Sequence, residues 1–171
     1  MIRTARPFVE AINPPSLAPP AGHFDRAVRI GPWLTVSGTS ALTNLTGPVE
    51  ERSLPADFRA QAELTFDNIA AVLAAVDAGF EHVYEIHATL ARAEDFGTLN
   101  DIFRVRIPER GFVGSGYVAE FLGPGMLLEI EVRAYLPDFA DGSTPRGPGA
   151  PIHPTDPIPA IDPTDPNGDH A

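Results

Sequence analysis

The amino-acid sequence predicts an α+β sandwich in which two helices stack on one face of a β-sheet. Apolar residues alternate with polar or small ones over residues 26–36, a pattern typical of paired strands. The period becomes helical from Ala56, and a dense strand-like block covers residues 114–136. The predicted order is therefore two strands, a helix, a strand, a helix and two strands.

The chain is expected to begin with an extended arm over residues 1–20, because two proline pairs within it disfavour a helix. A β-hairpin follows, with its turn at Gly31 and Pro32. Residues 43–55 are rich in Gly, Pro, Ser, Asn and Glu, which predicts a loop.

Two helices are predicted from apolar residues spaced three and four apart. The first runs from Ala56 to a stop at Gly79, and its inward face comprises Phe58, Ala62, Phe66, Ile69, Leu73 and Val76. Alternating and β-branched residues then predict a strand over residues 82–91. The second helix is closed by Pro108, and its predicted inward residues are Phe96, Leu99, Ile102 and Phe103.

The last predicted elements are two strands, residues 117–122 and 127–136, on either side of a turn signal at residues 123–125. We expect these strands to pair as a hairpin. The last strand is predicted to be apolar on both faces, because it carries Leu127, Leu128, Ile130 and Val132. The sheet face opposite the helices would then need a cover, which self-association would supply.

These patterns divide the chain into the arm at residues 1–20, one α+β domain at residues 21–138, and a tail at residues 139–171. A length of 171 residues with 43% apolar side chains suits a single core. The tail is rich in Pro and Asp and has too little apolar surface to offset its ordering entropy. We expect it to be disordered or extended.

The composition disfavours several partners. A net charge of −11 opposes binding to nucleic acid, which attracts basic surfaces. No apolar run reaches the roughly 20 residues that cross a bilayer, and no secretory segment is recognised, so a cytoplasmic protein without a membrane partner is expected. The lack of cysteine removes thiolate nucleophiles and cysteine-rich metal sites. Gly-rich phosphate-binding signatures are absent, and no cofactor is predicted.

Several short segments share an order and spacing with a known family: residues 22–28, Ser37 and Gly38, residues 60–62, residues 66–69, Asp95 and Phe96, Asn100, and residues 129–131. On these segments the chain resembles the RidA/YjgF family over roughly residues 14–137. The resemblance implies a chorismate-mutase-like sandwich with a mixed sheet, and a homotrimer whose sheets form a central barrel. It also implies ligand clefts between subunits, where the best-known members hydrolyse reactive enamines or imines to ketoacids and ammonia.

The resemblance further implies ligand-binding residues. Phe24 stands where the family often has a tyrosine, and Gly38 offers its backbone at the floor of the pocket. Asn100 and Glu129 keep the residue types of the family.

One family residue is replaced. Deaminating members carry an arginine at the start of the penultimate strand, where it binds the substrate carboxylate bidentately. Ser115 occupies that position here, and Tyr117 stands where a small residue is common. Arg110 lies just upstream and could fill the place of the arginine, although an exposed loop charge is the alternative. Tyr117 should narrow the cleft, and without such a cation the cleft should favour a neutral or differently oriented ligand.

Glu129, Ser115 and Glu120 are the candidate catalytic residues. A carboxylate would position water for attack on a C=N carbon, and burial would raise its pKa toward a useful range. The alternative is that Glu129 and Glu120 are solvated strand residues.

The sequence offers two further arrangements of polar side chains. Glu85 and His87 alternate onto one strand face, but two ligands without a third do not predict a metal. Ser115 with a histidine and a carboxylate would form a triad, yet its flanking glycines open a strand instead of a nucleophile elbow. Neither a metal site nor covalent serine catalysis is predicted.

Two functions remain, and Ser115 separates them. The first is a divergent RidA-like hydrolase that binds a small imine, enamine or ketoacid-type metabolite in inter-subunit clefts and cleaves the C=N bond. The second is a trimer that binds a metabolite or partner without catalysis. Ribonuclease activity is the least favoured, because of the acidic charge and because no histidine pair is placed for phosphoryl transfer.

Overall fold

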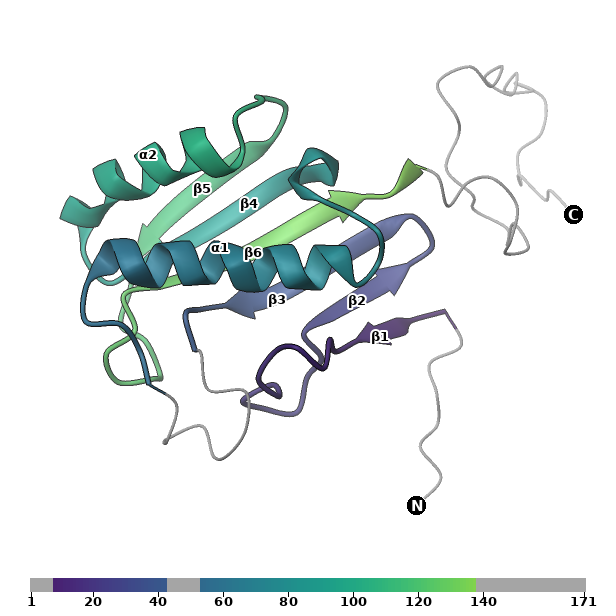
Figure 1. Ribbon diagram of the computed structural model, residues 1–171, viewed down its shortest axis with the longest axis horizontal. Helices are drawn as coiled ribbons and strands as arrows, with labels where there is room; N and C mark the ends of the chain where they lie inside the picture. Colours follow the sequence, from purple (N-terminus) through teal and green to yellow (C-terminus); the bar gives the residue numbers. More distant parts are fainter. Residues whose placement is uncertain (1–7, 43–52, 138–171) are drawn as a thin grey trace, which may run out of the picture. The chain divides into compact units, whose positions relative to one another are not determined.

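The computed structural model describes residues 8–42 and 53–137. These residues form an α+β sandwich with a mixed six-stranded sheet in the order β1-β2-β3-β6-β4-β5. All neighbouring strands are antiparallel except β4 and β5, which are parallel. Both α-helices lie on one face of the sheet (Figure 1). The elements are β1 (Glu10–Ile12), β2 (Ala27–Ile30), β3 (Trp33–Thr39), α1 (Phe58–Ala74), β4 (Val83–Leu90), α2 (Phe96–Arg106), β5 (Val113–Val118) and β6 (Leu128–Tyr135), with short 3-10 helices η2 (Phe80–His82) and η3 (Ala93–Asp95).

The first hairpin forms as predicted. Strands β2 and β3 pair antiparallel around Gly31, whose φ of 56° is accessible to glycine without the strain that a side chain would cause. Leu34 and Val36 alternate inward and are buried, while Trp33 and Thr35 face the other side. The preceding arm also contributes a strand that was not predicted, because Glu10–Ile12 pairs with β2 at the sheet edge.

Helix α1 carries the predicted buried stripe, but it ends earlier than predicted. Asp57 caps its first turn by accepting the Ala60 N–H at 2.9 Å. The helix ends at Ala74, before the predicted stop at Gly79, and Asp77 takes the left-handed backbone (φ 55°) that follows. Aspartate tolerates this conformation better than most residues, so the chain turns without a glycine.

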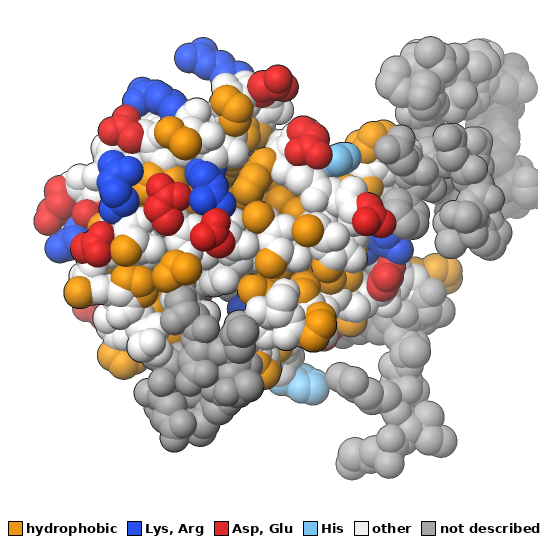
Figure 2. Space-filling model, viewed as in Figure 1, with side chains coloured by type: hydrophobic (Ala, Val, Ile, Leu, Met, Phe, Trp, Pro, Cys, Tyr) orange, Lys and Arg blue, Asp and Glu red, His pale blue; other side chains and the backbone are white. Residues whose placement is uncertain are grey.

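Helix α2 buries Leu99 and Ile102, and Phe103 packs edge-on against Phe66 of α1 with ring centroids 5.4 Å apart. The prediction that Phe96 faces inward is wrong, because its side chain is 56% exposed. Phe96 is the first residue of the helix, a turn before Leu99, where the buried stripe begins. Figure 2 shows acidic and basic side chains interspersed on this side of the molecule, and Arg106 pairs with Glu63 and Asp67.

The predicted hairpin of the last two strands is wrong. Strand β5 ends at Val118 and runs parallel to β4, while β6 inserts between β3 and β4. The glycine turn is present, with Gly125 at φ 78°, but it belongs to a longer connection between the two strands. Gln61 of α1 anchors that connection, because its buried amide donates to the Gly125 carbonyl at 2.8 Å and accepts the Leu127 N–H at 2.9 Å.

The prediction that β6 is apolar on both faces is also wrong. Leu128, Ile130 and Val132 alternate onto the same face and are fully buried against the helices. The opposite face of β6 carries Glu129, Glu131 and Arg133 instead. The open face of β6 is therefore polar, and the apolar side chains of β6 give no argument for self-association.

Residues 1–7, most of the loop predicted over residues 43–55, and the tail at residues 139–171 lie outside the described residues. Within the described part, neither α-helix combines the length and apolar character that a membrane-spanning helix requires.

Candidate functional site

The open face of the sheet contains a hollow of about 280 Å³, on the side away from the helices. Its walls come from three adjacent strands, because the register places Thr89 of β4 beside Tyr117 of β5 and beside Glu129 of β6. The lining residues are His87, Thr89, Tyr117, Glu129, Glu131 and Arg133. Period-two alternation brings these side chains to one face, and on β4 and β6 the apolar side chains between them enter the core.

Glu129 is the most perturbed acid of this hollow. Partial burial raises the pKa of its carboxyl, and the negative charge of Glu131 raises it further. Gly38 of β3 makes room for the carboxyl group, since a Cβ at position 38 would lie 2.7 Å from the Glu129 side chain. The irregular register of β3 between Val36 and Thr39 lies at this place. A carboxyl with a raised pKa keeps its proton to a higher pH than an exposed carboxyl does, which suits it to proton transfer.

A chain of polar side chains crosses the same face beside the hollow. The Ser115 hydroxyl is hydrogen-bonded to Nδ1 of His87, which lies directly opposite it on β4. Nε2 of His87 lies 2.7 Å from Oε1 of Glu85, and Nη1 of Arg133 donates to Oε2 of Glu85 at 2.7 Å. The bonds from Arg133 and then from His87 hold the pKa of Glu85 below its usual range.

This chain of contacts fixes the proton positions. Because Glu85 is ionised, it accepts a hydrogen bond from Nε2–H of His87. With a proton on Nε2, Nδ1 is the nitrogen that can accept the Ser115 O–H. The covalent serine arrangement that the sequence did not predict is therefore present in its hydrogen bonds.

The structure brings four of the predicted site residues together. Glu129 and Tyr117 line the hollow, Gly38 adjoins the Glu129 carboxyl, and Ser115 is bonded to His87 in its wall.

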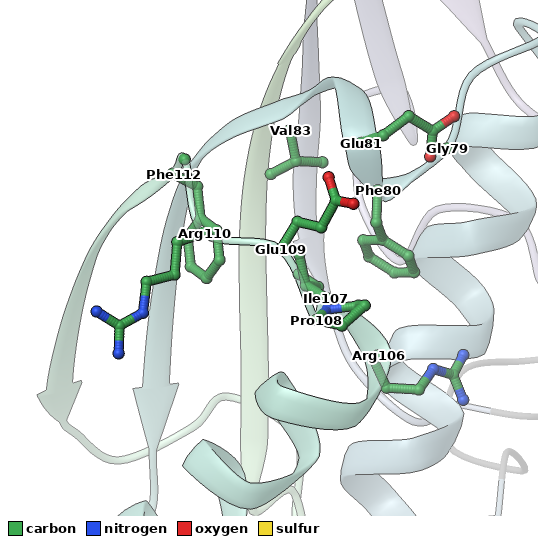
Figure 3. Close-up of a pocket in the computed structure, with 11 residues that line it drawn as sticks. Gly79, Phe80, Glu81, Val83, Arg106, Ile107, Pro108, Glu109, Arg110 and Phe112 are labelled. Carbon is green, nitrogen blue, oxygen red and sulfur yellow. The ribbon is translucent and has the colours of Figure 1, made fainter.

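The other four predicted residues do not line this hollow. Phe24 is half-exposed in the loop before β2, and Asn100 lies on α2. Glu120 is exposed in the connection after β5. Arg110 lines a second hollow of about 460 Å³ between η2 and the segment before β5. In Figure 3 its guanidinium points away from the other labelled side chains.

Sequence reasoning missed the roles of His87, Thr89, Glu131 and Arg133. The signal was the alternation of Glu85, His87 and Thr89 on one strand, but its meaning depended on which strands lie on either side. Among the described residues, no group of three or more His, Asp or Glu side chains is placed to hold a metal. Both oxygens of Glu85 are instead occupied by His87 and Arg133.

Comparison with known proteins places this site in context. The family model described as endoribonuclease L-PSP matches residues 15–136. A protein of Rattus norvegicus named 2-iminobutanoate/2-iminopropanoate deaminase is 28% identical over 125 residues, which are 72% of this chain and 88% of that protein. A RutC family protein of Pyrococcus abyssi is 23% identical over 116 residues, which are 68% of this chain and 88% of that protein.

Solved structures share the fold. The crystal structure of RidA from an Antarctic Psychrobacter bacterium superposes with a TM-score of 0.67 at 26% identity, covering 74% of this chain and 99% of that one. The yeast Mmf1 structure gives a TM-score of 0.66 at 19% identity, covering 75% of this chain and 98% of that one. The predicted α+β class, with a mixed sheet and helices on one face, is confirmed by these likenesses.

Proposed function

The chain belongs to the endoribonuclease L-PSP family, the RidA/YjgF family of the sequence resemblance, and on this premise we propose that it binds small imines or enamines in the hollow of the open sheet face and hydrolyses their C=N bond. The products are a carbonyl compound and ammonia. Relatives named as 2-iminobutanoate/2-iminopropanoate deaminases support this reaction class.

The observation that carries the proposal is the Glu129 carboxyl, half-buried in the hollow with a raised pKa and with Gly38 leaving space for it. General acid–base catalysis works best when the pKa of the catalytic group lies near the working pH. Glu129 is the only acid in the described residues whose pKa is clearly shifted upward. This makes it the group to transfer protons in the reaction.

The reaction proceeds by water attack. Protonated Glu129 donates its proton to the imine nitrogen, and the resulting carboxylate then takes a proton from water as the water oxygen bonds to the carbon. The carboxyl returns that proton to the nitrogen of the carbinolamine. The C–N bond then breaks, ammonia leaves, and the hydroxyl proton passes back to the Glu129 carboxylate as the carbonyl forms, which restores the protonated acid. The chain contains neither lysine nor cysteine, so no side-chain amine or thiol can form a covalent adduct at the imine carbon.

The charges of the hollow favour a neutral substrate. Glu131 repels carboxylates, and the cation in the wall, Arg133, is already paired with Glu85. Ser115 provides a hydroxyl where deaminating relatives are expected to carry arginine. We therefore propose imines of uncharged carbonyl compounds as the preferred substrates.

A second subunit would complete the cleft. The hollow is open, Tyr117 in its wall is 63% exposed, and its volume lies just below the range of roughly 300–1,000 Å³ typical of ligand sites. We propose a homotrimer in which a neighbouring sheet supplies the missing wall. RNA cleavage is not proposed, because two glutamates line the hollow and the chain carries a net charge of −11.

The experiment is an ammonia-release assay on imines generated in situ from uncharged amines and from amino acids. Wild type is expected to accelerate release from the uncharged imines, and Glu129→Gln should lower the rate roughly 100-fold or more. Glu109→Gln, an exposed acid outside this hollow, is the matched control and should retain the rate.

The alternative function, binding without turnover, makes a different prediction. A wild-type protein that binds a ketone or ketoacid by calorimetry, yet releases no more ammonia than Glu129→Gln, would be a binding module. That outcome would reject the hydrolase proposal.

A further inference from the structure

The Ser115, His87 and Glu85 side chains form a hydrogen-bonded line on the open sheet face, which imine hydrolysis by Glu129 does not use. We propose that Ser115 is a nucleophile that accepts the acyl group of small uncharged esters, with His87 as its general base and Glu85 orienting the imidazole. This acyl-transfer activity goes beyond the imine chemistry proposed above and does not depend on it.

The order of the hydrogen bonds is that of a catalytic triad. A triad needs a hydroxyl that donates to an imidazole nitrogen and a carboxylate that accepts from the other ring nitrogen. Here Ser115 O–H meets Nδ1, and Nε2–H meets Glu85 at 2.7 Å. The two ring nitrogens exchange the places they have in chymotrypsin-like proteases, but either nitrogen of a neutral imidazole can act as the base.

Arg133 makes the arrangement more rigid. Its guanidinium holds Glu85 at 2.7 Å from the strand on the other side of β4, so the carboxylate is fixed from two directions. Ser115, His87 and Arg133 lie on three adjacent strands, whose ladder sets their spacing. The side chain of His87 is still 34% exposed, which leaves the base accessible to a substrate.

Backbone amides beside Ser115 can stabilise an oxyanion. Ala119 N–H donates to the Leu90 carbonyl, and amides alternate in direction along a parallel ladder. The amides of Gly114 and Gly116 therefore point to the open edge of β5, where no strand pairs within the described residues. The amide that follows a nucleophilic serine is a common oxyanion donor, and glycines on both sides leave the hydroxyl unshielded.

The chemical steps balance without a cofactor. Ser115 Oγ bonds to the acyl carbon while Nδ1 of His87 takes the hydroxyl proton. The proton passes to the leaving alkoxide, which departs as an alcohol and leaves an acyl-serine. Water then bonds to the acyl carbon and gives a proton to Nδ1, and that proton returns to Oγ as the carboxylic acid leaves.

The surroundings define the substrate class. Glu131 in the adjoining hollow disfavours anionic acyl groups, and a space of about 280 Å³ suits small ones. Short-chain esters of uncharged acids meet both requirements.

The test uses the full-length protein with 4-nitrophenyl acetate and with a small alkyl phosphonofluoridate. Wild type is expected to release a burst of one nitrophenolate per chain and to gain one phosphonyl group, which peptide mapping assigns to Ser115. The chain has no lysine or cysteine to compete for the reagents, and peptide mapping separates a label on Ser115 from one on a tyrosine or histidine. Ser115→Ala should abolish both signals, and His87→Gln should slow the burst roughly 100-fold or more.

Ser16→Ala removes an exposed hydroxyl outside the sheet and should leave the burst and the label unchanged. If Ser115→Ala does not fold, peptide mapping of wild type decides alone. A label on another residue, or no label where a known serine esterase is fully modified, would overturn the proposal. Loss of ammonia release in Glu129→Gln with an intact ester burst would show that the two activities are separate.

Discussion

At the scale of single residues, a glycine on β3 sets the environment, and so the pKa, of a glutamate on the neighbouring strand β6. Gly38 leaves the space in which the Glu129 carboxyl lies, and that space is partly shielded from water. Shielding penalises the charged form, and Glu131 adds repulsion. The resemblance to the family pointed to Gly38 and Glu129, but only the structure shows that one makes room for the other.

Gly38→Ala should therefore disturb Glu129 more than the fold. A Cβ at 2.7 Å from the carboxyl forces that group to move, and we expect a loss of about 1 kcal/mol in the free energy of unfolding. Urea unfolding of Gly38→Ala, Glu129→Ala and the double variant measures the coupling. The cost of Gly38→Ala should disappear when Glu129 is already alanine, and an unchanged cost would show that the backbone is the source of strain.

The raised pKa of Glu129 predicts a pH-dependent stability. The folded protein binds this proton more tightly than the unfolded chain, so the contribution of Glu129 is fully present below its ordinary pKa of 4.5 and is lost as pH rises through the folded-state pKa. Glu129→Gln should consequently raise Tm relative to wild type at pH 8 and leave it nearly unchanged at pH 4. Calorimetric scans at both pH values test this, with Glu109→Gln as an exposed control whose effect should be similar at both. A lower Tm for Glu129→Gln at pH 8 would contradict the sign.

At the scale of elements, the local sequence pattern predicted most strands and helices, but it did not predict which strands pair in the sheet. The period-two stretches of β2, β3, β4 and β6 and the buried stripe of α1 are visible in the sequence. The pairing partner of β5 is not visible in the sequence, because a parallel pairing depends on the crossover through α2 and on contacts distant in sequence. A triad at Ser115 was not predicted, because the glycines around it open a strand instead of a nucleophile elbow. The parallel register that places Ser115 opposite His87 is visible only in the structure.

The connection that carries the chain from β5 to β6 depends on Gln61. Its amide is buried, donates to the carbonyls of Pro55 and Gly125 and accepts the Leu127 N–H. Gln61→Leu keeps a similar volume but leaves these backbone groups without partners, at a cost of about 3 kcal/mol in the free energy of unfolding. Urea denaturation compares it with Arg59→Leu, an exposed position on the same helix that should change stability by less than about 0.5 kcal/mol. Equal effects of the two substitutions would show that Gln61 is not an anchor.

At the scale of the whole molecule, the two sides of the sheet have different characters. The helix side is closed by a continuous apolar core, and the other side presents acids, hydroxyls and a group of aromatic rings. Trp33 is 46% exposed there and packs edge-on against Tyr135 and Tyr84, with ring centroids 4.9 and 5.7 Å apart. A trimer formed through this face would bury the rings and close the hollow.

A substitution that tests the trimer must therefore lie on the open sheet face and not in the core. Leu128 of β6 is fully buried in the core, so Leu128→Glu should unfold the chain instead of dissociating it. Trp33→Glu places a charge on the open face and should convert a particle of about three times the 18.3 kDa chain mass into a folded monomer. Light scattering at micromolar concentration measures the mass, and circular dichroism verifies the fold. Val105→Glu is the matched control, because Val105 is an exposed apolar residue on α2 and its replacement should leave the trimer intact. A wild-type protein that is monomeric, or a Trp33→Glu variant that keeps the wild-type mass, would exclude assembly through the aromatic end of this face.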